Sequence, residues 1–149
     1  MFVVDTNVLV YAANRGAPEH LRCRELLLAF REQATPWYVT WGIAYEFLRI
    51  ATHPRVFRAP WSPGEAWSFL EALLASPALG VLVEGERHAA ILAGLVASVP
   101  QLAGNLVHDA HTAALMREHG IRVIYTRDND FHRFPGVEVR DPLRWSGAP

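Results

Sequence analysis

The sequence predicts an α/β fold built around a mostly parallel sheet. Short apolar or β-branched segments alternate along the chain with longer segments in which apolar residues recur every three or four positions. Strands separated by helical segments of about ten residues or more are typical of βαβ units. The chain has 149 residues, the length of one ordinary domain. We therefore expect a single domain over residues 1–149.

Five segments are predicted as strands because they are short and rich in apolar, β-branched or aromatic residues. They are Phe2–Val4, Trp37–Trp41, Leu79–Val83, Ile121–Thr126 and Val137–Val139, the last at a sheet edge. Connections between parallel strands are right-handed, and ligands of such sheets bind beyond the carboxyl ends of the strands. The chemistry is therefore expected at that edge.

Helical patterns fill most of the chain between these strands. One helix is indicated by apolar residues at helical spacing, namely Cys23, Leu26, Leu27 and Phe30. Further helices are predicted over Gly42–Ala51, over Glu86–Ala97 and around Asp109–His119, the last ending at Gly120. The intervening segment Thr52–Trp61 contains two prolines and is predicted to be a loop.

The segment after this loop has a clear helix start. Ser62 is expected to cap the helix, Pro63 suits its first position, and Glu65 completes a capping box. Trp67 follows on the apolar face of this helix and is expected to lie in the core.

The composition favours a folded protein of the cytoplasm. Hydrophobic residues make up 51% of the chain and charged residues 19%, which argues against disorder. The single cysteine, Cys23, permits no intramolecular disulfide. The first residues lack the basic and apolar regions of a signal peptide, and no apolar run is long enough to span a membrane. We therefore expect neither a signal peptide nor a membrane partner.

The net charge of −1 does not indicate a class of partner, but all 14 basic residues are arginine. Genome composition is one explanation of this bias, because alanine and glycine are abundant too. The planar arginine side chain is also well suited to phosphate. Arg15, Arg49 and Arg127 follow or flank acidic segments and are candidates for contacts with RNA phosphates.

Four carboxylates are expected to meet at the carboxyl edge of the sheet. Asp5 directly follows the first strand, and Asp128 follows the fourth. Asp109 lies near the start of the helix that leads into the fourth strand, and Glu46 lies in the helix after the second strand. Clustered carboxylates repel one another, and a hard divalent cation such as Mg²⁺ or Mn²⁺ is the usual reason for them to coexist. Such an ion lowers the pKa of bound water and polarises a phosphate.

Each acid has another interpretation when it is considered alone. Asp5 could form a turn or a helix cap, and Asp109 could be an N-cap. Glu46 could be a solvated helix residue, and Asp128 to Asp130 could form an acidic turn. The metal-site hypothesis therefore depends on the four acids occurring together.

At these residues the sequence resembles PIN domains, and specifically the VapC-type toxins of bacterial toxin–antitoxin pairs. The matching segments are Val3–Asn7, Glu46, Asn105–His111, Thr126–Phe131 and Arg133–Val137. The resemblance extends to Pro142, nearly the whole chain. A start of the form Asp-Thr-Asn is weak evidence alone, whereas all of these segments in this order are specific.

The resemblance implies a three-layer α/β/α sandwich with a parallel sheet of about five strands. It also implies a site for Mg²⁺ or Mn²⁺, endonucleolytic cleavage of RNA to products with a 5′-phosphate and a 3′-hydroxyl, homodimerisation, and inhibition by a cognate antitoxin protein. The family motif assigns the catalytic, metal-binding acids to Asp5, Glu46, Asp109 and Asp128.

Four further residues are expected to support this site. Asp130 is the alternate to Asp128 as the fourth acid. The hydroxyls of Thr6 and Thr126 and the amide of Asn7 are expected to orient a carboxylate or a bound water.

Histidine and tryptophan near these segments have two interpretations each. His108 and His111 are spaced so that both could ligate zinc, but no cysteine or third histidine lies nearby in the sequence, so a role outside metal binding is favoured. Trp41 and Trp61 could stack on RNA bases, although packing in the core or at a partner interface is favoured.

Other functions were compared with the nuclease hypothesis. A haloacid-type phosphatase needs Asp-x-Asp after the first strand, where this chain has Asp5-Thr6-Asn7. A receiver domain needs a late lysine, and this chain has no lysine. A non-catalytic RNA-binding or scaffold PIN domain usually loses the acids that this chain retains.

Overall fold

The structure, a computed structural model, describes residues 1–144. Its five strands form one sheet in the order β3-β2-β1-β4-β5, and every neighbouring pair is parallel. The strands are β1 (Phe2–Val4), β2 (Trp37–Thr40), β3 (Leu79–Leu82), β4 (Val123–Tyr125) and β5 (Glu138–Arg140). The predicted parallel sheet is confirmed, and the predicted strand positions agree with it to within one or two residues.

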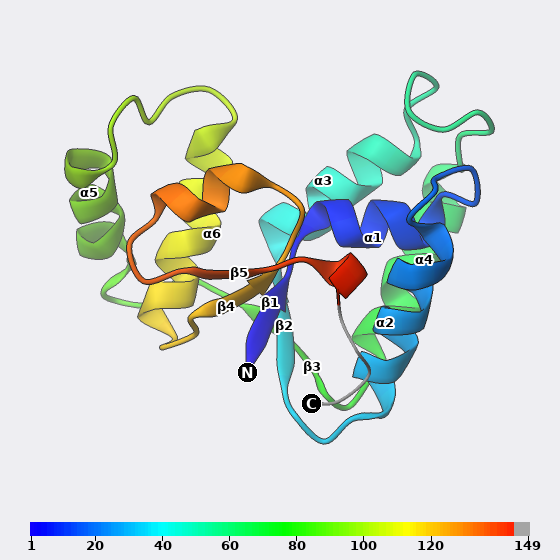
Figure 1. Cartoon of the computed structure of the whole chain (residues 1–149), viewed down its shortest axis with the longest axis horizontal. Coiled ribbons are helices and arrows are strands. Elements are labelled where there is room, and N and C mark those ends of the chain that lie inside the picture. The colour runs from blue at the N-terminus through cyan, green and yellow to red at the C-terminus, as the bar shows by residue number, and fades with distance from the viewer. Residues whose placement is uncertain (145–149) are drawn as a thin grey trace.

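Six α-helices and two 3₁₀ helices connect the strands. They are α1 (Thr6–Ala13), α2 (His20–Glu32), α3 (Trp41–Ala51), α4 (Pro63–Leu74), α5 (His88–Ser98), α6 (Leu106–Glu118), η1 (Asn129–Arg133) and η2 (Pro142–Arg144). The chain runs outward from β1 through β2 to β3 and then crosses back to β4, beside β1. Helices α1 to α4 lie on one side of the sheet, and α5 and α6 lie on the other (Figure 1). This arrangement is the α/β/α sandwich that the resemblance implied.

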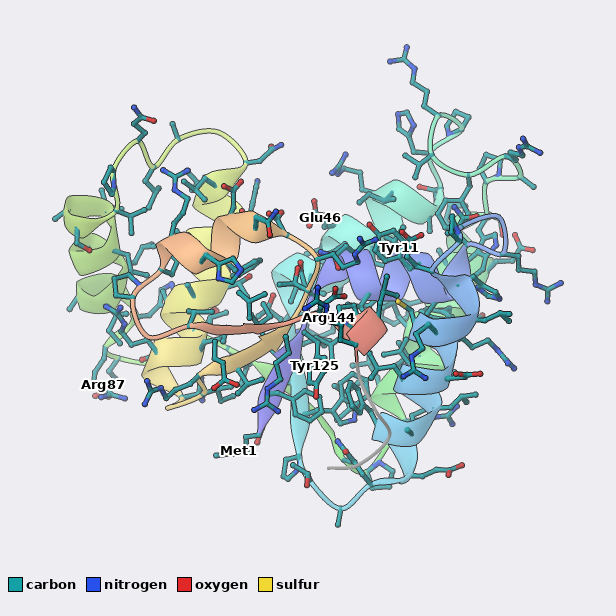
Figure 2. All side chains as sticks on the ribbon, in the orientation of Figure 1. Met1, Tyr11, Glu46, Arg87, Tyr125 and Arg144 are labelled. Atoms are coloured by element: carbon teal, nitrogen blue, oxygen red, sulfur yellow. The ribbon has the colours of Figure 1, made fainter. Side chains whose placement is uncertain are left out.

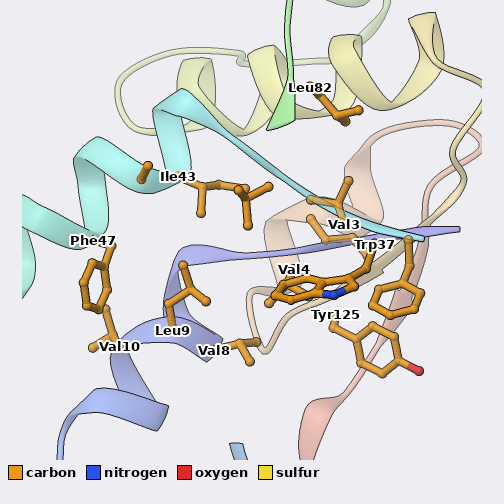
Figure 3. Close-up of a cluster of buried hydrophobic side chains, with 14 of the residues drawn as sticks. Val3, Val4, Val8, Leu9, Val10, Trp37, Ile43, Phe47, Leu82 and Tyr125 are labelled. Atoms are coloured by element: carbon orange, nitrogen blue, oxygen red, sulfur yellow. The ribbon is translucent and has the colours of Figure 1, made fainter. Parts of the chain in front are cut away.

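The residues of β1 show why the sheet is covered on both faces. Successive side chains of a strand point to opposite faces, yet Phe2, Val3 and Val4 are all buried. Val3 and Val4 lie close to Trp37 and Tyr125 in the core (Figure 3). A short continuous apolar segment is therefore a central strand here.

Helix α1 was not predicted from the sequence. Six of its eight residues are buried, because the helix packs against both α2 and α3. A helix buried on most sides has no polar stripe, so the periodicity that identifies an amphipathic helix is absent.

The local signals at other helix ends are confirmed, with one error in the predicted core. Ser62 and Glu65 form the predicted reciprocal capping box, with hydrogen bonds of 3.2 and 2.7 Å. Gly120 has a φ of +70° just after α6, the left-handed conformation that ends many helices. The placement of Trp67 in the core is wrong, because its side chain is 42% exposed. Leu70 and Leu73 bury the apolar face of α4 instead.

Aromatic packing joins α2 to the sheet. The Phe30 ring centroid lies 4.5 Å from that of Phe2, 5.1 Å from that of Tyr125 and 5.9 Å from that of Trp37. These rings come from α2, β1, β2 and β4. The cluster therefore stabilises the central pairing on which the site described below depends.

Replacement of Phe30 by alanine is expected to lower the free energy of unfolding by about 3–5 kcal/mol, because it leaves a cavity among these rings. Urea denaturation followed by circular dichroism measures this change. Leu21→Ala, on the same helix but 69% exposed, is the matched control and should change stability by about 0.5 kcal/mol or less. Equal effects of the two substitutions would contradict the importance of the aromatic cluster.

Candidate active site

The acidic residues lie at the point where the strand order reverses. β1 and β4 are neighbours in the sheet, but their connections leave in opposite directions, to β2 and to β5. The loops at the carboxyl ends of two such strands diverge and leave a crevice between them. Asp5 directly follows β1, and Thr126 and Asp128 follow β4.

Three hydrogen bonds hold the Asp5 carboxylate, and Asp5 is only 8% exposed. Its Oδ1 accepts from the backbone N–H of Thr6 at 2.7 Å, so Asp5 does cap α1. Its Oδ2 accepts from Thr126 Oγ1 and from Asn7 Nδ2, both at 2.6 Å. The cap interpretation and the site interpretation are therefore compatible, because each uses a different oxygen of the carboxylate.

Thr126 connects three parts of the site through one hydroxyl. It donates to Asp5 Oδ2 and accepts from Asn7 Nδ2 at 2.7 Å and from the backbone N–H of Asp128 at 2.9 Å. A hydroxyl has one hydrogen and two lone pairs, so all of its bonding capacity is used. The direction of the Asp5 carboxylate is thereby tied to the start of the loop after β4.

Glu46 reaches the site from α3 and interacts with α1. Its Oε2 accepts from Thr6 Oγ1 at 2.9 Å, and its Oε1 lies 3.3 Å from Arg49 Nη2. The Glu46 side chain is 44% exposed. Figure 2 shows Glu46 near the middle of the molecule, between the two groups of helices.

Three aspartates form the most compact part of the site. Carboxylate oxygens of Asp109, Asp128 and Asp130 all lie within 4.8 Å of one another. Asp128 Oδ1 also accepts from the backbone N–H of Asp130 at 2.8 Å and so caps η1. Asp109 is not an N-cap, since Asn105 holds that position and Asp109 lies inside α6. Asp130 therefore lies beside Asp128 in the cluster.

Burial and mutual repulsion raise the pKa values of two of these acids. Burial raises the pKa of Asp5 to about 6; its hydrogen bonds from Thr126 and Thr6 oppose this shift, while Glu46 and Asp128 add to it. Burial likewise raises the pKa of Asp109 to about 7, reinforced by Asp128 and the other acids of the cluster. Carboxylates that are buried beside other carboxylates need a compensating positive charge to ionise near neutral pH.

A cavity of about 560 Å³ gives access to Asp5, Glu46 and Asp109, whereas Asp128 and Asp130 line another cavity of about 430 Å³. The first of these cavities is lined by residues of α1, α3 and α6, including Asp5, Glu46 and Asp109. The polar side of α3 contributes Tyr45 and Arg49 as well, at helical spacing from Gly42. Sequence reasoning did not place Tyr45 here, although its position one residue before Glu46 on the exposed face of the helix was an available signal.

The three candidate arginines have different surroundings. Arg49 lines the cavity that holds the acids. Arg127 lies beside Asp128 but its Nη1 contacts Glu19 Oε1 at 2.6 Å. Arg15 lines a separate, larger cavity of about 1220 Å³ formed by the loops after α1 and α3, which contains none of the four predicted acids. The structure thus brings Arg49 to the acids and does not bring Arg15.

The aromatic and histidine residues considered from the sequence are also divided. Trp61 packs against Phe47, Phe57 and Phe69 at ring distances of 5.6–6.3 Å. Trp41 is 41% exposed. His108 and His111 both line the cavity of the acids.

The parallel sheet, with acidic residues at the point where the strand order reverses, defines an α/β protein with an acidic site. Comparisons with known proteins identify its family. The PIN domain model matches residues 2–137. Ribonuclease VapC48 of Mycobacterium tuberculosis is 36% identical over 139 residues, which cover 93% of this chain and 95% of the relative. Ribonuclease VapC43 of the same species is 38% identical over 143 residues, 96% of each chain. The chain therefore belongs to the PIN-domain family, and within it to the VapC ribonucleases.

Solved structures agree with this fold. The M. tuberculosis VapC20 toxin, described as cleaving the sarcin–ricin loop, superposes with a TM-score of 0.67 at 22% identity, covering 95% of this chain and all of that one. VapBC2 from Rickettsia felis, bound to a DNA fragment from its promoter, gives a TM-score of 0.66 at 18% identity, covering 93% and 96%. Among residues 1–144, no helix is both long enough and apolar enough to cross a membrane.

Without divalent cations, the free energy of unfolding is expected to fall as the pH rises from about 4 to about 7. In the unfolded chain the carboxyls of Asp5 and Asp109 ionise near pH 4, whereas in the folded protein they hold their protons to about pH 6 and 7. Protons bound by the folded state stabilise it at low pH, and this contribution is lost as the pH passes the folded pKa values. It is about 3 kcal/mol for Asp5 and, because water screens the partly exposed Asp109 side chain, less for Asp109 than its larger pKa shift would give.

Urea denaturation in EDTA from pH 4 to pH 8 measures this dependence. Asp109→Asn is the matched variant, because it keeps the side-chain size and removes one titrating group. Its stability should fall less over the same pH interval. Parallel curves for the two proteins would contradict the raised pKa of Asp109.

Proposed function

We propose that this chain is a divalent-metal-dependent endoribonuclease that hydrolyses RNA phosphodiester bonds as the toxin of a toxin–antitoxin pair. Its relatives over nearly the whole chain are named ribonucleases. The proposal includes a location in the cytoplasm. It treats residues 1–149 as one nuclease domain, since the family match covers residues 2–137.

The observation that carries the proposal is a set of carboxylates in and beside one cavity. Asp5, Glu46 and Asp109 line it, and Asp128 and Asp130 have carboxylate oxygens within 4.8 Å of Asp109. Burial and repulsion hold the pKa values of Asp5 and Asp109 near 6 and 7. Perturbed acids in a cavity are typical of a functional site rather than a solvated surface.

The donor chemistry fits Mg²⁺ or Mn²⁺. The candidate ligands are all hard carboxylate oxygens, the kind these ions prefer, and a few carboxylates suffice because Mg²⁺ retains water. We propose Asp5, Glu46, Asp109 and Asp128 as the ligands, with Asp130 as a supporting acid. When bound, such an ion polarises the phosphate and lowers the pKa of water.

The remaining contacts indicate what the protein's own side chains do. Thr126 and Asn7 both bond Asp5 Oδ2, so they orient that carboxylate. Thr6 does the same for Glu46. Arg49 can contact a phosphate if it gives up its 3.3 Å contact with Glu46, whose side chain is half-buried. These residues therefore position the acids and the substrate.

The partners follow from the same proposal. RNA is the substrate, and a cognate antitoxin protein is the inhibitor, as the family resemblance implies. We also propose that the chain forms a homodimer, as the family resemblance implies.

Asp109→Asn is expected to reduce RNA cleavage by at least about a hundredfold, because it removes one cation ligand from the most compact part of the site. Cleavage of a labelled RNA with added Mn²⁺, together with calorimetric titration of Mn²⁺, measures the two effects. Circular dichroism should show an unchanged fold.

Asp141→Asn is the matched control, since Asp141 lies outside both the cavity and the aspartate cluster. It should leave cleavage and Mn²⁺ binding at the wild-type level. Full cleavage by Asp109→Asn would contradict the proposed site. Absence of both Mn²⁺ binding and cleavage in the wild-type protein would favour a scaffold function instead.

Replacement of Arg49 by alanine is expected to reduce the salt dependence of RNA binding, whereas the same change at Arg15 should not. Each phosphate contact to single-stranded nucleic acid adds about 0.7 to the slope of log K against log salt concentration. Binding to the non-cleaving Asp109→Asn protein, measured by fluorescence anisotropy over a salt series, gives the slopes. An unchanged slope for Arg49→Ala would remove this residue from the RNA contacts.

A further inference from the structure

A second group of side chains that could hold a metal ion includes none of the five acids. Ligand atoms of Glu84, His88 and His111 all lie within 4.8 Å of one another. Glu84 belongs to the loop after β3, His88 is the first residue of α5, and His111 lies in α6. Sequence reasoning paired His111 with His108, but the fold brings His88 and Glu84 to His111 from the preceding connection.

The contacts within this group show that its donors converge. His111 Nε2 lies 2.7 Å from Glu84 Oε1. The rings of His88 and His111 meet edge to face, with centroids 5.2 Å apart. The His88 side chain is only 12% exposed. Two imidazoles and a carboxylate from three separate elements therefore face one another.

His88 also has the surroundings of a metal-ligating histidine. Its Nδ1 is buried and makes no hydrogen bond within residues 1–144, but lies 3.5 Å from Glu118 Oε2. Ligating histidines usually direct the second ring nitrogen at a carboxylate, which fixes the ring and makes the ligating nitrogen more basic. With Nδ1 facing Glu118, Nε2 is the ring nitrogen of His88 that is left to ligate an ion.

Glu118 is itself held in place for this role. Its carboxylate accepts from the backbone N–H groups of Gly85 and Arg87, both at 3.1 Å. A fixed anion therefore lies behind His88.

We propose that Glu84, His88 and His111 form a second metal site, which takes Zn²⁺ or a similar transition-metal ion rather than Mg²⁺. Imidazole nitrogen suits Zn²⁺, Co²⁺ and Ni²⁺, whereas Mg²⁺ prefers oxygen alone. Three protein ligands leave one position of a tetrahedral ion for water. Binding requires the hydrogen on His111 Nε2 to move to Nδ1. The Nε2 lone pair then faces the ion, and the hydrogen bond from Nε2 to Glu84 is lost.

The position of this site gives it a structural consequence. An ion there joins the loop after β3 and the start of α5 to α6, which also carries Asp109. His111 lies two residues after Asp109 and lines the cavity of the acids. Zn²⁺ is therefore expected to stabilise the wall of the active-site cavity. This inference does not depend on the chain being a nuclease.

Calorimetric titration of ZnCl₂ into tag-free protein in excess Mg²⁺ tests the proposal. Wild-type protein should bind one more equivalent of Zn²⁺ than Glu84→Gln or His88→Ala. Glu84→Gln is the decisive variant, because the Glu84 side chain is 55% exposed and its replacement has the same size. His108→Ala is the matched control, since His108 lies in α6 with His111 but outside the group of Glu84, His88 and His111. This variant should bind as many equivalents of Zn²⁺ as wild type.

Thermal unfolding gives an independent readout. An ion bound only by the folded state raises the melting temperature. Zn²⁺ should raise it more in wild type and His108→Ala than in Glu84→Gln. Equal Zn²⁺ stoichiometry and equal thermal shifts in wild type, Glu84→Gln and His88→Ala would overturn the proposal, because any Zn²⁺ bound would then belong to the acidic cluster.

Discussion

The parallel pairing of β1 with β4 sets the geometry of the acidic site. The registers Phe2 with Val123 and Val4 with Tyr125 place Asp5 beside Thr126, and the backbone N–H of Asp5 donates to the carbonyl of Tyr125 at 3.1 Å. The Thr126 hydroxyl then reaches the Asp5 carboxylate at 2.6 Å. Because side chains alternate along a strand, a slip of one residue would turn both groups to the wrong face. The aromatic cluster that packs against β1 and β4 therefore supports the geometry of the acidic site as well as the stability of the fold.

Around that fixed pair the protein gathers acids that oppose its own stability. Near neutral pH the burial and repulsion that raise the pKa values of Asp5 and Asp109 act against the folded state when no cation is present. A core that covers both faces of the sheet offsets this cost. The same arrangement gives a bound cation a large advantage, because the ion removes repulsion that the folded protein already contains. Stability and metal affinity are in this way coupled through the same carboxylates.

The proposed second metal site differs from the first in its chemistry and in its origin. The acids come from the strand ends and from α3 and α6, whereas Glu84, His88, His111 and Glu118 all belong to the connection between β3 and β4, which includes α6. That connection crosses the sheet on the opposite side from α1 to α4 (Figure 1). Helix α6 is the element common to both sites, since it carries both Asp109 and His111, which line one cavity.

The sequence by itself determined the parallel α/β fold and which acids are candidates. Periodicity and capping are local, so the five strands and the start of α4 were recognisable from neighbouring residues. The tertiary structure decided what depends on distant residues. Helix α1 lacks a polar stripe because packing buries it on most sides, and Trp67 is exposed because Leu70 and Leu73 already fill the apolar face of α4.

The same division applies to the two sites. Asp5 directly follows β1 and Asp128 lies in the loop just after β4, so the topology of a parallel sheet was enough to place them together. The separation of Arg49 from Arg15, and the meeting of His88 with His111, depend on how loops and helices pack across the sheet. Sequence spacing carries no information about such contacts, because they join residues through space rather than along a strand or a turn.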